Sequence, residues 1–278
     1  MLKLRVIPTL LFDGFTLVKG KNFASWRTVS ALIQQVQIYA LRGVDEMILL
    51  DINSTNRKTP INFNLIKEIT ENIFMPFTVG GGVQSIEDIR LLLKNGADKV
   101  AINTAAFHDK NFIKDAVKIF GSSTICINIE TLKIDNSYKI YTDSGRTDVN
   151  INTFDWIKEV QDLGVGEIII TSINNEGTGK GFDINLYEKA SKLSNIPLLA
   201  HGGAKKPEDV YEVFSKTNVD GAVVASAFHF NYYKELLDKK DIHLTGSTNF
   251  LKNNNNHPIL FGIKNLKEYL KSKKIEIR

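Results

Sequence analysis

The segment Gly43-Val44-Asp45-Glu46-Met47-Ile48-Leu49 recurs 121 residues later as Gly164-Val165-Gly166-Glu167-Ile168-Ile169-Ile170. Other matched pairs follow in the same order at offsets of 121 or 122 residues: Gly81-Gly82 with Gly202-Gly203, Ile86-Glu87-Asp88 with Pro207-Glu208-Asp209, and Asp98, Asn103 and Thr104 with Asp220, Ala225 and Ser226. A period of about 120 residues is too long for a solenoid repeat but equals four strand–helix units. The repeat therefore favours a closed barrel made of two similar halves.

Short apolar runs alternate with amphipathic helical patterns along the chain. The expected strands are 4–10, 46–52, 77–80, 99–103, 124–129, 167–172, 196–200 and 222–225, and the expected helices between them are 31–42, 64–72, 86–93, 111–120, 153–163, 186–193 and 207–214. Strands that are apolar throughout are typical of a parallel sheet buried on both faces. Eight such units predict an α/β fold, a (β/α)8 TIM barrel. A doubly wound open sheet is the alternative, because a strand count does not show closure.

The length of 278 residues is compatible with one large domain spanning residues 1–278. We expect the two halves at about 1–121 and 122–230, an asparagine-rich insertion at about 245–261 and a closing helix at about 263–272. The polar stretch 131–149 is expected to form a hairpin or excursion after the fifth strand.

Composition excludes several classes of protein. The formal net charge is +4, but its excess lies in residues 231–278, so we expect no nucleic-acid partner. The one cysteine, Cys126, excludes a disulfide framework and a cysteine zinc cage, is expected in the core, and suits a reducing compartment such as the cytoplasm. No apolar run approaches the 18 residues of a membrane span. No metal-ligand spacing is present, and we expect neither a metal nor a cofactor.

Two glycine-rich segments are the strongest indication of a site. They end the third and seventh strands, and in a barrel the carboxyl ends of strands carry the active site. Glycines there allow backbone N–H groups to approach a phosphate closely, and amide or hydroxyl groups at the next strand ends add donors. The two expected phosphate sites are Gly82 with Asn103 and Thr104, and Gly203 with Ala225 and Ser226. The alternative is that these glycines only make tight turns.

Charged and polar residues also occur at strand ends. Four charges lie at or near strand starts and could form an ionic ring across the barrel floor, here called the floor ring: Arg5, Glu46, Lys99 and Glu167. The alternative is a set of separate surface pairs of little energetic value. At the opposite strand ends, Asp51 and Glu130 could provide general acid–base chemistry. Of the five histidines, only His201 lies where a site is expected.

A dozen segments, in order, resemble the HisF family, the cyclase subunit of imidazole glycerol phosphate synthase. They are 6–8, 17–20, 22–23, 50–52, 77–82, 96–99, 102–103, 166–168, 171–173, 176–178, 202–204 and 228–230. The resemblance implies a duplicated half-barrel that binds a substrate with two phosphates, in addition to a HisH-like glutaminase partner that docks on the floor. Ammonia then passes through a gate formed by the floor ring to the mouth of the barrel. The substrate-binding positions that it implies are Lys19, Asp51, Ser172 and His201.

The catalytic positions depart from the family pattern. The first catalytic aspartate position is Leu11, which cannot exchange a proton, and the second is Glu130, which moves the charge by about one methylene. Asp13 lies two residues beyond Leu11 and would face the same way if the strand continued. Glu176, a further catalytic candidate, and Asn174 replace family aspartates, and His201 replaces a serine.

These departures favour a divergent branch, the amidation-associated paralogues encoded with surface-polysaccharide genes. The preferred hypothesis is that the barrel takes ammonia from the glutaminase for a separate sugar amidotransferase, with a phosphorylated sugar-type molecule as ligand. The alternatives are the classical cyclase of histidine biosynthesis, a lyase-class enzyme, and a non-catalytic scaffold that activates the glutaminase.

Overall fold

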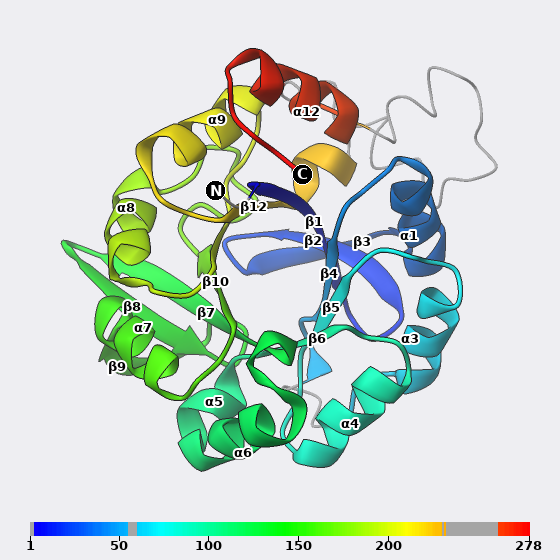
Figure 1. The fold of residues 1–278 in the computed structure, drawn as a ribbon, viewed down its shortest axis with the longest axis vertical. Helices are drawn as coiled ribbons and strands as arrows, with labels where there is room; N and C mark the ends of the chain where they lie inside the picture. The colour runs from blue at the N-terminus through cyan, green and yellow to red at the C-terminus, as the bar shows by residue number, and fades with distance from the viewer. Residues whose placement is uncertain (1–2, 55–59, 230, 232–260) are drawn as a thin grey trace.

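The computed structural model describes residues 3–54, 60–229, 231 and 261–278 (Figure 1). Eight strands form a closed parallel barrel: β1 (Arg5–Phe12), β4 (Met47–Asp51), β5 (Phe77–Gly80), β6 (Lys99–Ile102), β7 (Ile125–Ile134), β10 (Glu167–Ser172), β11 (Leu198–His201) and β12 (Gly221–Val224). Each pairs with the next, β12 pairs with β1, and pairing of β7 with β10 completes the ring. The closed barrel is confirmed, and the open sheet is excluded.

Helices surround the barrel as an outer ring (Figure 1). The longer helices are α1 (Leu32–Leu41), α3 (Phe63–Thr70), α4 (Ile86–Lys94), α6 (Lys110–Phe120), α7 (Thr153–Asp162), α8 (Ile184–Leu193), α9 (Pro207–Lys216) and α12 (Ile263–Ser272). A short helix, α5 (Thr104–His108), and a 3-10 turn, η1 (Ser122–Thr124), lie near β6 and β7. The predicted closing helix is α12, whereas the predicted insertion at 245–261 lies almost wholly outside the described residues. No helix in this described part has the length and apolarity to cross a membrane.

Aspartates at matched positions of the sequence repeat make the same backbone hydrogen bonds in both halves of the barrel. Asp88 accepts hydrogen bonds from the backbone N–H groups of Gln84 and Ser85 at the start of α4. Asp209 does the same for residues 205 and 206 at the start of α9. Asp98 and Asp220 likewise accept from the first residues of β5 and β11, each at 2.8 Å. The repeated residues therefore begin equivalent elements in each half.

The repeat extends to a hairpin that the sequence analysis missed. β2 (Thr16–Lys21) and β3 (Ala24–Ala31) follow β1 as an antiparallel pair. Residues 121 positions later form β8 (Ser137–Thr142) and β9 (Thr147–Asn152) after β7, which is the predicted excursion. The helix expected from residue 31 begins at Leu32, because Ala31 still pairs in β3.

The first hairpin reaches across the mouth of the barrel. The Asn22 side chain donates to the carbonyls of Ile173 and Asn174, at 2.8 and 2.7 Å. The backbone N–H of Asn22 donates to the carbonyl of Glu176. Asn22 and Phe23 at the hairpin turn both have positive φ angles, 51° and 60°. These contacts join the loop after β1 to the loop after β10 (Figure 1).

The barrel interior forms a small apolar cluster separate from the main core. Its buried members each come from a different strand: Ile7, Ile48, Cys126, Ile169, Leu199 and Val223. The main core lies between the strands and the helices. Cys126 is fully buried, as expected, and burial raises the pKa of its thiol well above the usual value.

Candidate active site

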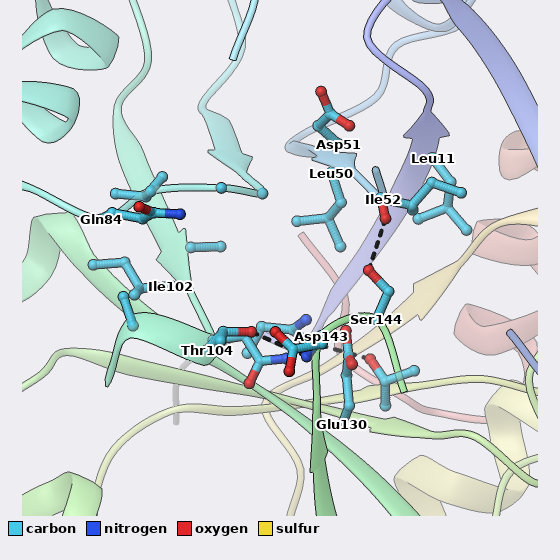
Figure 2. Close-up of a pocket in the computed structure, with 18 of the residues that line it drawn as sticks. Leu11, Leu50, Asp51, Ile52, Gln84, Ile102, Thr104, Glu130, Asp143 and Ser144 are labelled. Carbon is cyan, nitrogen blue, oxygen red and sulfur yellow. Dashed lines mark hydrogen bonds between the residues drawn. The ribbon is translucent and has the colours of Figure 1, made fainter. Parts of the chain in front are cut away.

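A cavity of about 580 Å³ opens at the carboxyl ends of the strands (Figure 2). Its lining combines strand ends from both halves with loop residues. The polar lining groups include Asp51, Asn103, Thr104, Asn128, Glu130, Asp143, Ser144, Thr171 and His201. The apolar lining includes Leu11, Phe23, Trp26, Leu50 and Ile102. The cavity therefore lies where a barrel enzyme carries its active site.

Leu11 lines this cavity and is buried, so an aliphatic side chain occupies the expected position of the first acid–base group. β1 ends at Phe12, and Asp13 turns into the following loop, where its Oδ1 accepts hydrogen bonds from Phe15 and Thr16. Asp13 is not part of the cavity lining. Its carboxylate stabilises the turn that ends the strand, and its role as a substitute for Leu11 stays a prediction.

Glu130 lies on β7, two residues after Asn128, and like Asn128 it lines the cavity. Burial raises the pKa of its carboxyl from 4.5 to about 8, although hydrogen bonds from the Gly145 backbone and the Asn103 side chain partly oppose the rise. The nearby Asp143 carboxylate raises it further. A carboxyl with this pKa keeps its proton near neutral pH and can donate it to a ligand.

The first predicted phosphate site lies in the cavity wall. Gly82 has φ +69°, and a Cβ there would lie 2.0 Å from the Ser54 hydroxyl, so only glycine fits. Asn103 and Thr104 line the same cavity at the end of β6. The Thr104 hydroxyl accepts a hydrogen bond from the Asp143 backbone at 3.2 Å, which brings the second hairpin onto this site (Figure 2).

The second predicted phosphate site stands apart from this cavity. Gly203, Ala225 and Ser226 follow β11 and β12, and none of them is part of the lining. A Cβ at Gly203 would lie 2.1 Å from the Gly181 carbonyl, so the loop after β10 packs directly on this glycine. The structure therefore brings the first trio to the cavity and not the second.

Asp51 and Ser172 occupy equivalent strand ends in the two halves. Asp51 lines the cavity, and its Oδ1 accepts hydrogen bonds from the backbone of Asn53 and Ser54, both at 2.9 Å. Ser172 is buried, and its hydroxyl lies 3.4 Å from Asn175 Oδ1. Both predicted substrate-binding residues thus shape the loops that follow their strands, while only Asp51 reaches the cavity.

Behind the cavity wall lies a buried group of ionisable residues: Lys19, Glu176 and His201. His201 lines the cavity, whereas the other two do not. Burial lowers the pKa of Lys19 to about 8, and Glu176 partly offsets this. Within the described residues, Lys19 Nζ has no hydrogen-bond partner. Burial also lowers the pKa of His201, so its imidazole is neutral near pH 7.

At the opposite end of the barrel, the floor-ring residues form a closed cycle of ion pairs. Arg5 lies 3.2 Å from Glu46 and 2.7 Å from Glu167. Lys99 lies 3.1 Å from Glu46 and 3.0 Å from Glu167. The two glutamates are buried and the two cations are part-buried. Burial alone would lower the pKa of Lys99, but the glutamates outweigh it and raise the pKa.

Comparison with known proteins agrees with this geometry. The histidine biosynthesis protein family matches residues 5–234. The chain is 40% identical over 247 residues to imidazole glycerol phosphate synthase subunit HisF of Thermococcus onnurineus, which covers 87% of this chain and 98% of that protein. The chain belongs to the HisF family. HisF of Streptococcus mutans serotype c is 38% identical over 231 residues, 83% of this chain and 92% of that protein.

HisF of Methanocaldococcus jannaschii is 37% identical over 253 residues, with 84% of this chain and 93% of that protein covered. The predicted HisF resemblance is therefore confirmed. These relatives carry the name of the histidine-pathway synthase, so they favour the classical reaction over sugar amidation, the preferred hypothesis from the sequence.

Sequence reasoning missed several cavity residues. Phe23 and Trp26 come from the first hairpin, and Asp143 and Ser144 come from the second. Ser144 donates a hydrogen bond to the carbonyl of Ile52 at 2.7 Å, which fixes the second hairpin over the mouth (Figure 2). The 121-residue offset could have located both hairpins, because residues 22 and 143 occupy equivalent turns.

Proposed function

We propose that this chain is the ammonia-receiving subunit of an imidazole glycerol phosphate synthase. A glutaminase docked on the barrel floor releases ammonia, which passes the floor ring, crosses the barrel interior and reacts with a phosphorylated ribotide in the cavity. The observation that carries this proposal is the closed floor ring at the end of the barrel opposite the cavity. A buried cycle of ion pairs adds little net stability to the barrel floor, because desolvation of the charges offsets much of their Coulomb attraction.

The interior between the floor ring and the cavity supports a path for a small neutral molecule. Small and apolar side chains fill it next to the ring, including Cys126, Ile7 and Ile48. Nearer the cavity, the buried Thr171 hydroxyl and the Asn128 amide face each other at 3.4 Å. Ammonia is small, uncharged and capable of hydrogen bonding with these groups as it approaches the mouth.

The floor also offers an apolar surface for a partner. Phe74 is fully exposed in the turn before β5, and Leu41 is largely exposed at the end of α1, just before β4. Both positions precede strands and therefore lie on the floor side. Exposed large apolar residues at the floor end of the barrel fit a docked protein better than open solvent.

The test compares two sources of ammonia in the complex of this chain with its glutaminase. Glu46→Gln removes one carboxylate from the floor ring, and Glu212→Gln removes an exposed carboxylate on α9 as the matched control. We expect Glu46→Gln to lower product formation from glutamine at least about tenfold while reaction with added ammonium salt changes little. Equal loss with both sources would show that the ring does not guide ammonia.

Amidation of a surface sugar is the second candidate, and Leu11 favours it. The cavity presents an aliphatic group where the classical reaction needs a proton-transferring one, and loss of such a group typically costs about 10²–10⁴-fold in rate. In this case a sugar amidotransferase would consume the ammonia. Growth without histidine of a cyclase-deficient bacterium that expresses this chain and its glutaminase supports the first candidate. Soluble, folded protein without growth supports the second.

A third candidate is a scaffold that only activates the glutaminase. It predicts that calorimetry detects no binding of a phosphorylated ligand such as ribose 5-phosphate to the wild-type chain. A Gly82 variant should then behave in the same way as the wild type. Measured binding that depends on Gly82 would exclude it.

A further inference from the structure

Three residues form a continuous row across the rim of the cavity. In the strand register, Thr171 on β10 lies directly between Glu130 on β7 and His201 on β11. All three line the cavity. Neighbouring strands lie about 4.8 Å apart, so Glu130 and His201 lie about 10 Å apart along the barrel wall, with Thr171 between them.

The Thr171 hydroxyl is bonded to the imidazole. Its Oγ1 lies 3.0 Å from His201 Nδ1, and 3.4 Å from Asn128 Oδ1. The backbone at the end of β11 is held as well, since the Tyr187 hydroxyl donates to the His201 carbonyl at 2.5 Å. The ring therefore lies beside a hydroxyl on a residue that lines the cavity.

Glu176 decides which ring nitrogen carries the proton. Its Oε2 lies 3.6 Å from His201 Nε2, longer than a hydrogen bond but close enough for a strong electrostatic preference. A carboxylate there favours a proton on Nε2. The neutral ring then has its lone pair on Nδ1. The single hydroxyl proton of Thr171 is donated to that nitrogen at 3.0 Å rather than to the more distant Asn128 Oδ1 at 3.4 Å.

We propose that His201 is a catalytic base of this cavity, acting through the Thr171 hydroxyl, and that Glu176 is its positioning residue. A ligand N–H or O–H bond breaks, and its electron pair stays on the ligand. The proton passes to Thr171 Oγ1 as the hydroxyl's own proton passes to His201 Nδ1. The resulting imidazolium carries Nε2–H toward Glu176. This arrangement of hydroxyl, imidazole and carboxylate follows the logic of a catalytic triad.

The surrounding charges suit this role. Glu176, from the loop after β10, raises the pKa of His201, whereas burial and Lys19, from β2, lower it. His229, after β12, lies near the same lysine and is kept neutral, because burial lowers its pKa well below the usual value. Two strands away along the barrel wall, Glu130 has its pKa raised to about 8. The wall thus presents a neutral base and a protonated acid, the pairing that proton-transfer sites require.

The proposal rests on the proposed function only for the identity of the ligand, so its first test needs no turnover. Nitrogen NMR of the full chain with labelled histidine reports the tautomer and the protonation pH of His201, assigned by loss of its signal in His201→Gln. We expect the Nε2–H tautomer at pH 7.5. Glu176→Gln lowers the protonation pH, Lys19→Met raises it, and Glu176→Asp stays near wild type.

The second test measures ammonium-driven turnover of the ribotide substrate against pH in the glutaminase complex. His201→Gln and Thr171→Val should each lose at least about a hundredfold, and Glu176→Gln should shift the acidic limb of the profile, while Glu212→Gln follows wild type. An Nδ1–H tautomer, or protonation indifferent to Glu176→Gln, overturns the proposal. Full turnover in His201→Gln also overturns it. An inactive wild-type complex instead contradicts the proposed function and leaves the NMR result to decide this one.

Discussion

Replacing Glu130 by glutamine should make the protein less sensitive to alkaline pH. The pKa of this carboxyl is raised from 4.5 to about 8 in the fold. As the pH rises from about 4.5 to 8, the unfolded chain releases this proton while the folded chain retains it. The free energy of unfolding therefore falls across that window, and the decline is complete above about pH 8.

The size of this effect follows from the pKa shift. Each pKa unit is worth about 1.4 kcal/mol, so the full shift corresponds to about 5 kcal/mol. Between pH 6 and pH 9 the wild type should lose about 3 kcal/mol from this group alone, because the folded carboxyl keeps its proton up to about pH 8 while the unfolded one is already ionised. Glutamine has the same shape and does not titrate, so Glu130→Gln should lack this part of the decline.

Urea unfolding followed by circular dichroism at pH 6 and pH 9 measures the difference. All other titrating groups are common to both proteins and cancel in the comparison. Glu212→Gln, on the exposed face of α9, controls for the loss of a carboxylate as such and should follow the wild type. Parallel wild-type and Glu130→Gln profiles would refute the reasoning, since they would mean that Glu130 titrates in the fold as it does in the unfolded chain.

Three further changes test other parts of the structure. Gly82→Ala should weaken binding of ribose 5-phosphate at least about tenfold by calorimetry, because the new Cβ collides with Ser54. Gly43→Ala is the control: Gly43 has the same φ of +69° but lies in open space, so this variant should bind as the wild type does. Retained binding in Gly82→Ala would place the phosphate elsewhere. Cys126 should resist a thiol reagent in the folded protein and react fully in urea, since burial suppresses its thiolate; rapid reaction of the folded chain would show that the barrel interior is open to the reagent. Phe74→Ser should weaken association with the glutaminase by about 1–3 kcal/mol without changing the melting temperature; unchanged affinity would place the docked partner away from this turn.

The barrel could be predicted because its determinants are local and repeated. Asp98 and Asp220 bond the first residues of β5 and β11, and each requirement appears in the sequence as a matched pair. The floor-ring residues were recognisable for a similar reason. A charge at the start of a strand, such as Glu46 or Glu167, is conspicuous in the sequence because the rest of the strand is apolar.

The residues at the mouth of the barrel were harder to predict from the sequence, because they come from hairpins that are distant in sequence from the strands they cover. The first hairpin mixes polar and apolar residues and turns at Asn22 and Phe23, a pair without the glycine that usually marks such a turn. The pKa of Glu130 depends on Gly145 and Asp143, which approach only when the second hairpin folds back. The turn at Asp13 was not foreseen either: β1 runs on to Phe12, past the expected end at residue 10, and the Asp13 carboxylate then accepts a hydrogen bond from the Thr16 backbone.

The last strand-like residues of the chain pair with the first. Leu4 forms a parallel bridge with Ile277, the backbone N–H of Leu4 donates to Glu276, and that of Arg278 donates to Leu4. This places Leu4 and the last residues of the chain beside Arg5, on the face that carries the floor ring (Figure 1). An affinity tag fused after Arg278 would therefore project over the surface proposed for the glutaminase. A tag used to capture that partner could itself block it, so binding experiments require a cleaved tag or capture through a surface on the helical ring.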